Sequence, residues 1–371
     1  MMSRHIHIVS FAIPFPADYG GVIDVFFRVK ALAEKGLKIH LHCFQYDDRK
    51  PSECLEKMCS SVNYYRRDVS FLRQLSVRPY IVASRDCREL VENLSKDDYP
   101  ILLEGLHCCS VLEKISDRRI FVRAHNVEHD YYSELAKVEK NIFKKSFFWL
   151  ESKRLRKYEE VLQRASGILC ITKKDYDYFS TRYKNVSLVP PLSAFSEVAP
   201  SEGCGDYVLY HGRLDVVENL NAVCFILDEV FPDDAVKLKI AGMNPPKCLY
   251  DRIARRKNTE LIANPSDDEM LGLVKNAQVN LLVTAQNTGL KLKLLNALYN
   301  GRHCLVNEAM VLGTGLAEAC EIRNDAKSLR ERCLSLMNAG LSSETIAKRR
   351  EIMRRFCDND KIISDLISAI V

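Results

Sequence analysis

The sequence predicts an α/β protein built from two doubly wound domains, each a parallel sheet covered by helices. Two observations support this fold class. Short apolar runs alternate with longer amphipathic stretches from one end of the chain to the other, which is the pattern of parallel strands joined by crossover helices. The chain also has 371 residues, 47% of them hydrophobic, and single cores usually divide beyond roughly 250 to 300 residues.

The first domain is expected to span residues 1–190. Five apolar runs in it are predicted to be strands, and the stretches between several of them are long enough for helices. The runs cover residues 5–13, 38–46, 99–105, 119–126 and 165–172. No run of about 18 apolar residues occurs, and no small-residue cleavage site follows the N-terminal run, so neither a membrane span nor a signal peptide is expected.

A segment rich in Pro, Ser and Gly, residues 191–206, is predicted to be a linker. The second domain, residues 207–350, follows it with another series of apolar runs that predict strands. These runs cover residues 207–214, 236–243, 258–264, 279–285 and 303–309. The remaining residues, 351–371, include an amphipathic run that predicts a C-terminal helix.

The composition argues against several classes of protein. The formal net charge is +5, with Lys and Arg spread over both halves, so nucleic-acid binding is not expected. The 14 cysteines are diluted through a long chain, and their spacing matches neither a zinc site nor a CxxC motif. We therefore expect reduced thiols, no metal site and a cytoplasmic protein.

Two adjacent glycines, Gly20 and Gly21, follow the first predicted strand and precede a predicted helix. Ligands of parallel α/β sheets bind outside the carboxyl ends of the strands, where such loops lie. Two interpretations remain open. The glycines allow the backbone to approach a ligand, or they allow the helix to pack tightly on the sheet.

A dense group of polar side chains follows the predicted strand 119–126. The group consists of Arg123, His125, Asn126, Glu128, His129 and Asp130. Histidines and carboxylates at the carboxyl end of a strand indicate a site for proton transfer or for sugar hydroxyls. In the alternative interpretation, the last two residues open a helix in solvent and only His125 is partly buried.

The run NTGLKLKLLNALYNG, residues 287–301, is predicted to be a loop and a helix after the strand 279–285. The loop contains Thr288 and Gly289. Gly301 is expected to end the helix as a C-cap.

Three polar side chains form a stripe on this predicted helix. Lys293, Asn296 and Asn300 fall at i, i+3 and i+7, while the leucines face the core. The positive end of a helix dipole and its free N–H groups favour an anion, and a lysine one turn into the helix can reach the same anion. This pattern indicates a phosphate site. The alternative is a solvated helix face.

Five segments, in order along nearly the whole chain, match the motifs of one known enzyme family. The segments are 14–42, 123–136 (RAHNVEHDYYSELA), 207–223 (YVLYHGRLDVVENLNAV), 238–246 (LKIAGMNPP) and 289–306 (GLKLKLLNALYNGRHCLV). In the same order, they resemble the glycine loop, the HNVE element, the G-R-L and I-A-G strands and the G-x-x-x-K-x-x-E-A-x-x-x-G-x-P-V-V signature of retaining GT-B glycosyltransferases of the group-1, or GT4, family. The HNVE element is that of a subgroup used in polysaccharide biosynthesis.

The resemblance implies the GT-B fold, in which two Rossmann-like domains face each other across a cleft that holds the substrates. In this fold a C-terminal helix, here within 351–371, crosses back onto the N-terminal acceptor domain, while the C-terminal domain binds the nucleotide-sugar donor.

The resemblance also implies which residues act. Arg213 and Lys293 match cations that contact the donor diphosphate, and His125 matches a histidine that touches the transferred sugar. The other implied residues are Gly20, Gly21, Gly212, Thr288, Gly289 and Asn296 at the donor, with Glu128 and Asn126 as sugar or acceptor contacts.

Two positions depart from the family pattern. Asn296 replaces a glutamate that accepts hydrogen bonds from the ribose hydroxyls; the amide oxygen still accepts them, but without a charge. Asn219 stands six residues after Arg213, where many members place a second phosphate-binding lysine. One cation is therefore missing from that loop.

The implied reaction is transfer of a hexose-type sugar from a nucleotide-diphosphate sugar to a hydroxyl of a glycan or lipid-linked glycan, with retained anomeric configuration. The family has no DxD metal site, so no divalent metal and no cofactor are expected. A non-catalytic GT-B binding subunit is the main alternative, for which the two asparagines are the best evidence. A nucleotide-sugar 2-epimerase is the other, although the carboxylates and histidine of its site are not found at matching positions.

The stretch 140–158 (KNIFKKSFFWLESKRLRKY) interleaves aromatic and basic residues around the single Trp of the chain. It could lie on an anionic membrane, which suits a lipid-linked acceptor and a peripheral position on the inner face of the membrane. A long helix that packs on the sheet with a solvated basic side explains the pattern equally well.

Overall fold

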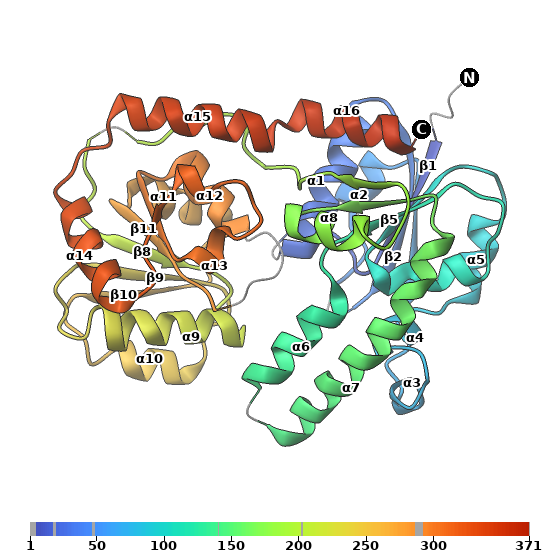
Figure 1. The fold of residues 1–371 in the computed structure, drawn as a ribbon, viewed down its shortest axis with the longest axis horizontal. Helices are drawn as coiled ribbons and strands as arrows, with labels where there is room; N and C mark the ends of the chain where they lie inside the picture. Colours follow the sequence, from blue (N-terminus) through green and yellow to red (C-terminus); the bar gives the residue numbers. More distant parts are fainter. Residues whose placement is uncertain are drawn as a thin grey trace. The chain divides into compact units, whose positions relative to one another are not determined.

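The computed structural model describes residues 5–17, 20–46, 49–139, 141–201, 203–285 and 292–370. The chain divides into two compact units (Figure 1). The first comprises Met1–Ser193 and Asn359–Val371, and the second comprises Ala194–Asp358.

The first unit contains a parallel sheet of seven strands in the order β3-β2-β1-β4-β5-β6-β7. Its strands are β1 (His5–Ser10), β2 (Lys38–Gln45), β3 (Ser61–Arg66), β4 (Ile101–Glu104), β5 (Ile120–Ala124), β6 (Gly167–Cys170) and β7 (Val186–Leu188). Each of the five runs predicted to be strands contains one. The two strands that were not predicted, β3 and β7, are the edges of the sheet, where half-exposed positions dilute the apolar signal.

The helices of the first unit connect these strands. They are α1 (Gly20–Glu34), α2 (Glu53–Met58), α3 (Phe71–Gln74), α4 (Tyr80–Ala83), α5 (Arg88–Leu94), α6 (Glu128–Val138), α7 (Ile142–Tyr158), α8 (Lys173–Ser180) and α16 (Asn359–Ile370), with 3₁₀ turns η1 (Leu106–Glu113) and η2 (Glu159–Arg164). Helices α6 and α7 lie side by side and extend away from the sheet (Figure 1).

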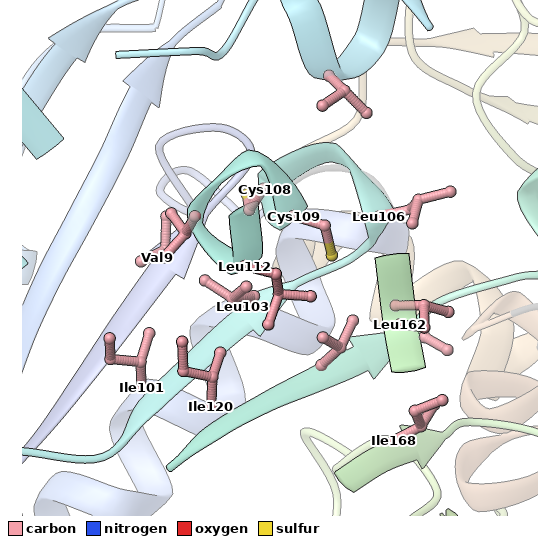
Figure 2. Packing of buried hydrophobic residues seen from close by; sticks show 14 of the residues in the cluster. Val9, Ile101, Leu103, Leu106, Cys108, Cys109, Leu112, Ile120, Leu162 and Ile168 are labelled. Atoms are coloured by element: carbon pink, nitrogen blue, oxygen red, sulfur yellow. The ribbon is translucent and has the colours of Figure 1, made fainter. Parts of the chain in front are cut away.

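The core of the first unit has two layers, because alternate residues of a strand point to opposite faces of the sheet. On one face, Val9 and Leu103 pack with Cys109 and Leu112 of η1 (Figure 2). On the other face, Ile6 and Ile8 pack with α1 and α16.

The second unit contains a parallel sheet of six strands in the order β10-β9-β8-β11-β12-β13. Its strands are β8 (Val208–His211), β9 (Leu238–Gly242), β10 (Thr259–Ala263), β11 (Val279–Leu282), β12 (His303–Val306) and β13 (Glu321–Ile322). Its helices are α9 (Val217–Phe225), α10 (Lys247–Ile253), α11 (Asp267–Asn276), α12 (Leu292–Asn300), α13 (Glu308–Val311), α14 (Ala326–Met337) and α15 (Ser343–Cys357), with a π-helical turn η3 (Ile226–Val230) and a 3₁₀ turn η4 (Ala317–Ala319). The predicted fold class, two parallel-sheet domains of the Rossmann type, is confirmed.

The run predicted to be a C-terminal helix is α16, which packs with α1 in the first unit, whereas the first residues of the segment 351–371 belong to a separate helix. Helix α15 belongs to the second unit and ends at Cys357, and α16 begins at Asn359 in the first unit. The side chain of Asn359 accepts a hydrogen bond from the backbone N–H of Ser193 and donates one to its carbonyl oxygen, both over 2.9 Å. Among the residues that the structure describes, no helix has both the length and the apolar character needed to cross a bilayer.

Candidate functional site

The turn after β8 in the second unit is built by close backbone packing. A Cβ atom on Gly242, at the end of β9, would lie only 1.7 Å from the carbonyl oxygen of Gly212. A Cβ on Gly212 would lie 3.2 Å from the side chain of Asn219. A residue without a Cβ is therefore required at Gly242, and the backbone of Gly212 is closely packed, where the carboxyl ends of these two central strands meet.

Lys293 projects from the first turn of α12 to this same place. Its Nζ donates to Asn219 Oδ1 over 2.8 Å and to the hydroxyl of Tyr210 over 3.2 Å, and it lies 4.9 Å from the centre of the Tyr210 ring. Asn219 Nδ2 in turn donates to the carbonyl oxygen of Arg213 over 2.9 Å. Asn219 thus joins the turn after β8 to the lysine of α12.

Arg213 lies in the same turn and makes a bidentate ion pair with Asp215. Its Nε is 2.9 Å from Oδ1, and its Nη2 is 3.1 Å from Oδ2. Burial by itself raises the pKa of Asp215, but the guanidinium of Arg213 lowers it below its usual range. The carboxylate is therefore charged at neutral pH, and an incoming anion would exchange with it for the arginine.

A buried histidine that sequence reasoning missed lies at the end of β8. His211 is buried, and its Nε2 has no hydrogen-bond partner among the described residues. Burial, and then the charge of Lys293, lowers the pKa of His211 to about 3. The imidazole is therefore neutral and adds no cation to this site.

The predicted stripe on α12 is only partly available to a ligand. Asn300 is buried, and its Nδ2 donates to Asn296 Oδ1 over 3.0 Å. A hydroxyl that donates to Asn296 must therefore share this oxygen with Asn300. The predicted loop residues Thr288 and Gly289 lie outside the described residues.

Helix α12 ends just before Gly301, as predicted, but the prediction that Gly301 is a left-handed C-cap is wrong. Gly301 does not have the positive φ of a left-handed cap. Instead, a Cβ there would lie 2.3 Å from the side chain of Asn280 on β11. The glycine allows α12 to pack closely on the neighbouring strand.

A buried charged cluster lies in the first unit, where β4 and β5 end beside α1. Arg28 donates to both carboxylate oxygens of Glu104, over 3.1 and 2.8 Å, and to Asp24 over 2.9 Å. Arg123 donates to Asp24 over 3.3 and 3.4 Å. His125 Nε2 lies 3.0 Å from the Glu104 oxygen that also binds Arg28. Two arginines, two carboxylates and one histidine therefore form one continuous network.

The network keeps its charges in the protein interior. Burial by itself raises the pKa of Asp24, but Arg123 and Arg28 lower it below its usual range. Burial lowers the pKa of Arg28, but Asp24 and Glu104 raise it above its usual value. One ligand atom from each of Asp24, Glu104 and His125 lies within 4.8 Å of the others, as metal ligands do. The arginines, however, already bind the same carboxylate oxygens.

His125, the predicted sugar contact, is oriented by its neighbours. Besides Glu104, the ring of Phe11 meets it edge-on with centroids 5.5 Å apart. Gly105 has a φ of +77°, and a Cβ there would lie 2.9 Å from His107 Nδ1 and 3.7 Å from His125 Cδ2. The glycine therefore leaves room for both imidazoles above the end of β4.

Glu128 and Asn126 line a cavity whose lining does not include His125. The cavity is lined by Leu106, Val122, Ala124, Asn126, Glu128, Glu159, Leu162 and Phe179. Burial, and then the nearby charge of Asp175, raises the pKa of Glu128 to about 8. Glu128 is therefore largely protonated at neutral pH. His125 is hydrogen-bonded to Glu104, although Glu128 is only three residues away in the sequence.

Gly20 and Gly21 open α1. A Cβ on Gly20 would have no atom within 4 Å. Helix packing therefore does not require a glycine at this position.

Comparisons with known proteins agree with the fold. No protein-family model matches the chain. An uncharacterized 44.6 kDa protein in the cps region of Klebsiella pneumoniae is 26% identical over 347 residues, which cover 86% of this chain and 87% of that one. Sucrose-phosphate synthase from Thermosynechococcus elongatus has a similar structure, with a TM-score of 0.71 and 15% identity over 98% of this chain and 97% of the synthase. HepE from Anabaena, solved with UDP and glucose, has a TM-score of 0.68 and 13% identity over 98% of each chain. The fold is therefore that of GT-B glycosyltransferases.

Proposed function

We propose that the protein is a retaining glycosyltransferase of the GT4 type. It transfers a hexose-type sugar from a nucleotide-diphosphate donor to a hydroxyl of a glycan or lipid-linked glycan. The fold it shares with sucrose-phosphate synthase and with a protein solved with UDP and glucose supports this class of reaction. The Klebsiella relative, described as a protein in the cps region, supports a role in polysaccharide assembly.

The observation that carries the proposal is that Lys293 reaches, through Asn219, the turn that carries Arg213 at the carboxyl end of β8. Asn219 accepts from Lys293 and donates to the backbone of Arg213, so one side chain links a helix and a turn that lie far apart in the sequence. The leaving group of the reaction is a nucleoside diphosphate, whose negative charge grows as the glycosidic bond breaks. Fixed cations stabilise that change more than they stabilise the substrate.

His125 is the proposed contact of the first unit with the transferred sugar. Its ring is held by Glu104, and Glu104 is held by Arg28, so the orientation of the imidazole is set before the substrate arrives. Arg213 and Lys293 perform the charge stabilisation that a metal ion provides elsewhere. The proposed reaction therefore proceeds without a divalent cation.

The test is calorimetric titration of the protein with UDP, GDP, ADP and CMP in the presence of a chelator. We expect one diphosphate to bind selectively, and the substitution Lys293→Ala to remove that binding. Turnover of the matching nucleotide sugar with a hydroxyl acceptor would then establish the transfer. Binding of no nucleotide, or equal binding by the variant, would contradict the proposed donor site.

A second candidate is a non-catalytic GT-B subunit that binds an acceptor or a partner. Two observations favour it. Arg213 is occupied by Asp215, and Lys293 is occupied by the neutral Asn219 rather than sharing the site with a second lysine. A diphosphate that binds without turnover of any of its sugars would select this candidate.

The proposed acceptor is lipid-linked, and the protein is proposed to contact the inner face of the membrane peripherally through residues 140–158. The helix α7 carries most of this stretch.

A further inference from the structure

The first unit concentrates exposed apolar side chains in two segments. Of the 18 large hydrophobic side chains that are exposed among the described residues, ten belong to these segments. They are Val69, Phe71, Leu72, Leu75 and Val77 around α3, and Val138, Ile142, Phe143, Trp149 and Leu150 around the start of α7. Phe143 is 83% exposed and Val77 is 88% exposed, so these side chains pack on almost nothing in the chain itself. Such a concentration marks a binding surface.

The two segments are in contact with each other. Arg154 Nη1 on α7 donates to the carbonyl oxygen of Gln74 on α3 over 3.0 Å. Glu151 accepts from the backbone N–H of Tyr80 over 2.6 Å, and the ring of Phe147 meets that of Tyr80 with centroids 6.2 Å apart. Figure 1 shows α3 beside α7, where the α6–α7 pair extends away from the sheet. The segments therefore contribute to one surface.

The periodicity of α7 extends this surface around the helix. Phe143 and Leu150 are seven residues apart and lie on one side, and Leu150 is one turn before Arg154, which touches α3. Ile142 and Trp149 are also seven residues apart and lie on the adjoining side. The apolar side chains thus cover two adjoining sides of the helix, one of them next to α3. Lys153 lies 5.7 Å from the centre of the Trp149 ring.

The same segments are strongly basic. Residues 141–158 contain six Lys and Arg residues and one acid, Glu151, which is buried and paired with Arg154. Residues 66–78 contain four arginines and one acid, Asp68, which is paired with Arg73 over 2.7 Å. The whole chain has a formal charge of only +5, so the rest of the molecule is net negative. The positive charge is therefore collected around the exposed apolar side chains.

We propose that residues 66–78 and the exposed side of α7 together form a docking surface for an anionic lipid bilayer. We call it the α3–α7 surface. Apolar and aromatic side chains enter the interface between head groups and acyl chains, and Lys and Arg bind the anionic head groups with their long stems along the apolar layer. The inference extends the membrane contact proposed above to a second segment. It rests on the proposed function only in taking the acceptor to be lipid-linked.

A bilayer fits this surface better than a second copy of the chain. A two-fold interface would bring the surface against itself, so that its lysines and arginines would face one another. The apolar side chains also lie on a projecting helix pair rather than in a groove, which suits insertion into a fluid layer. A protein partner would need to supply a strongly acidic surface.

The test uses the full chain, vesicles without nucleotide or sugar, and Trp149 as the single tryptophan fluorophore. Vesicles of phosphatidylcholine are compared with vesicles that also contain phosphatidylglycerol. We expect flotation with the anionic vesicles and a blue shift of the Trp149 emission, both weakened by salt. Absence of flotation, or equal binding to both kinds of vesicle, would overturn the proposal. Because no donor is present, this result is independent of the proposed transfer activity.

Variants identify the surface. Phe143→Ser with Leu150→Ser, and separately Phe71→Ser with Leu72→Ser, should each weaken vesicle binding by about ten-fold or more, since each pair removes two side chains from the bilayer. Tyr250→Ser with Leu312→Ser changes two exposed apolar residues of the second unit and should leave binding unchanged.

Two double charge-reversal variants test the role of the basic residues. Lys144→Glu with Lys145→Glu should weaken binding to anionic vesicles, while Lys257→Glu with Lys327→Glu alters the net charge equally and should not. An equal loss in both would mean that only net charge matters, and would overturn the assignment. A concentration-dependent dimer that Phe143→Ser abolishes would instead identify a second copy as the occupant.

Discussion

The Nζ of Lys293 lies 2.8 Å from Oδ1 of Asn219, so a helix of the second unit is hydrogen-bonded to the turn that carries Arg213. The amide oxygen of Asn219 accepts from Lys293, and its amide nitrogen donates to the backbone of Arg213. The asparagine holds the lysine in place without adding charge. Any diphosphate bound here therefore depends on Lys293 more than it would in a site with a third cation.

The first prediction concerns this lysine. Lys293→Ala should weaken diphosphate binding by about 1.5 to 3 kcal/mol, because it removes a charge-assisted contact. Asn296→Ala should have a smaller effect, since its amide oxygen is neutral and already accepts from Asn300. Calorimetry on both variants makes the comparison, with thermal melting as the control for folding. Equal and small effects would show that the phosphate lies elsewhere.

The second prediction concerns the buried network of the first unit. Glu104→Gln keeps the shape of the side chain but leaves Arg28 and Arg123 with Asp24 as the single carboxylate of the network. We expect the free energy of unfolding to fall by about 3 kcal/mol, because a buried charge loses its partner. Urea denaturation measures the change. The exposed pair Arg88 and Glu92 offers the control, since Glu92→Gln should cost less than about 0.5 kcal/mol.

The third prediction concerns stability in acid. His7 Nδ1 and His42 Nε2 are 2.9 Å apart on neighbouring strands, His7 also contacts Asp97, and His42 contacts the hydroxyl of Tyr65 over 2.8 Å. Burial, and then the charge of His7, lowers the pKa of His42 to about 3, against an ordinary value of 6.5. Between pH 3 and pH 6.5, therefore, His42 binds a proton in the unfolded chain but not in the folded chain.

Stability should accordingly be full above pH 6.5 and should fall as the pH drops from 6.5 towards 3. His42→Gln removes one of the groups responsible, so the loss of stability with falling pH should be shallower by up to about 1.4 kcal/mol per pH unit. Urea denaturation at a series of pH values tests this difference in slope. Parallel curves for the two proteins would refute the assignment to His42.

The fourth prediction compares two glycines. Gly242→Ala should lower stability by about 3 kcal/mol or more, because its Cβ would overlap the carbonyl oxygen of Gly212. Gly20→Ala should leave the melting temperature unchanged or slightly higher, since its Cβ meets nothing within 4 Å. If the backbone at Gly20 approaches the ligand as proposed, the Gly20 variant should still lose turnover. A fully active Gly20→Ala protein would remove this glycine from the site.

The central strands could be predicted from the sequence because both of their faces are buried, and burial on both faces produces continuous apolar runs. The edge strand β7 escaped prediction because its three residues are only partly covered. Gly301 was assigned to the right place for the wrong reason, since its contact with Asn280 depends on how α12 packs on β11. Local patterns therefore predicted which elements form, and packing determined why particular residues are needed.

The site residues divide in the same way. Arg213 and Lys293 were proposed from local motifs. Glu104 and its partner Arg28 were not, because they are 76 residues apart and meet only in the folded sheet. A signal was nevertheless present, since the charged pair Asp24 and Arg28 interrupts the apolar side of α1 at a spacing of one helical turn. Charged residues on an otherwise buried helix face indicate that each has an oppositely charged partner in the fold.

The hydrogen bonds between Ser193 and Asn359 have a topological consequence. The chain leaves the first unit immediately after Ser193 and re-enters it at Asn359, so the whole second unit is an insertion whose two ends emerge at one point. Insertions with adjoining ends tolerate excision and transplantation, because the host needs only a short bridge to close the gap. The unit that carries Arg213 and Lys293 is thus inserted, as one continuous segment, into the unit that carries His125 and the α3–α7 surface.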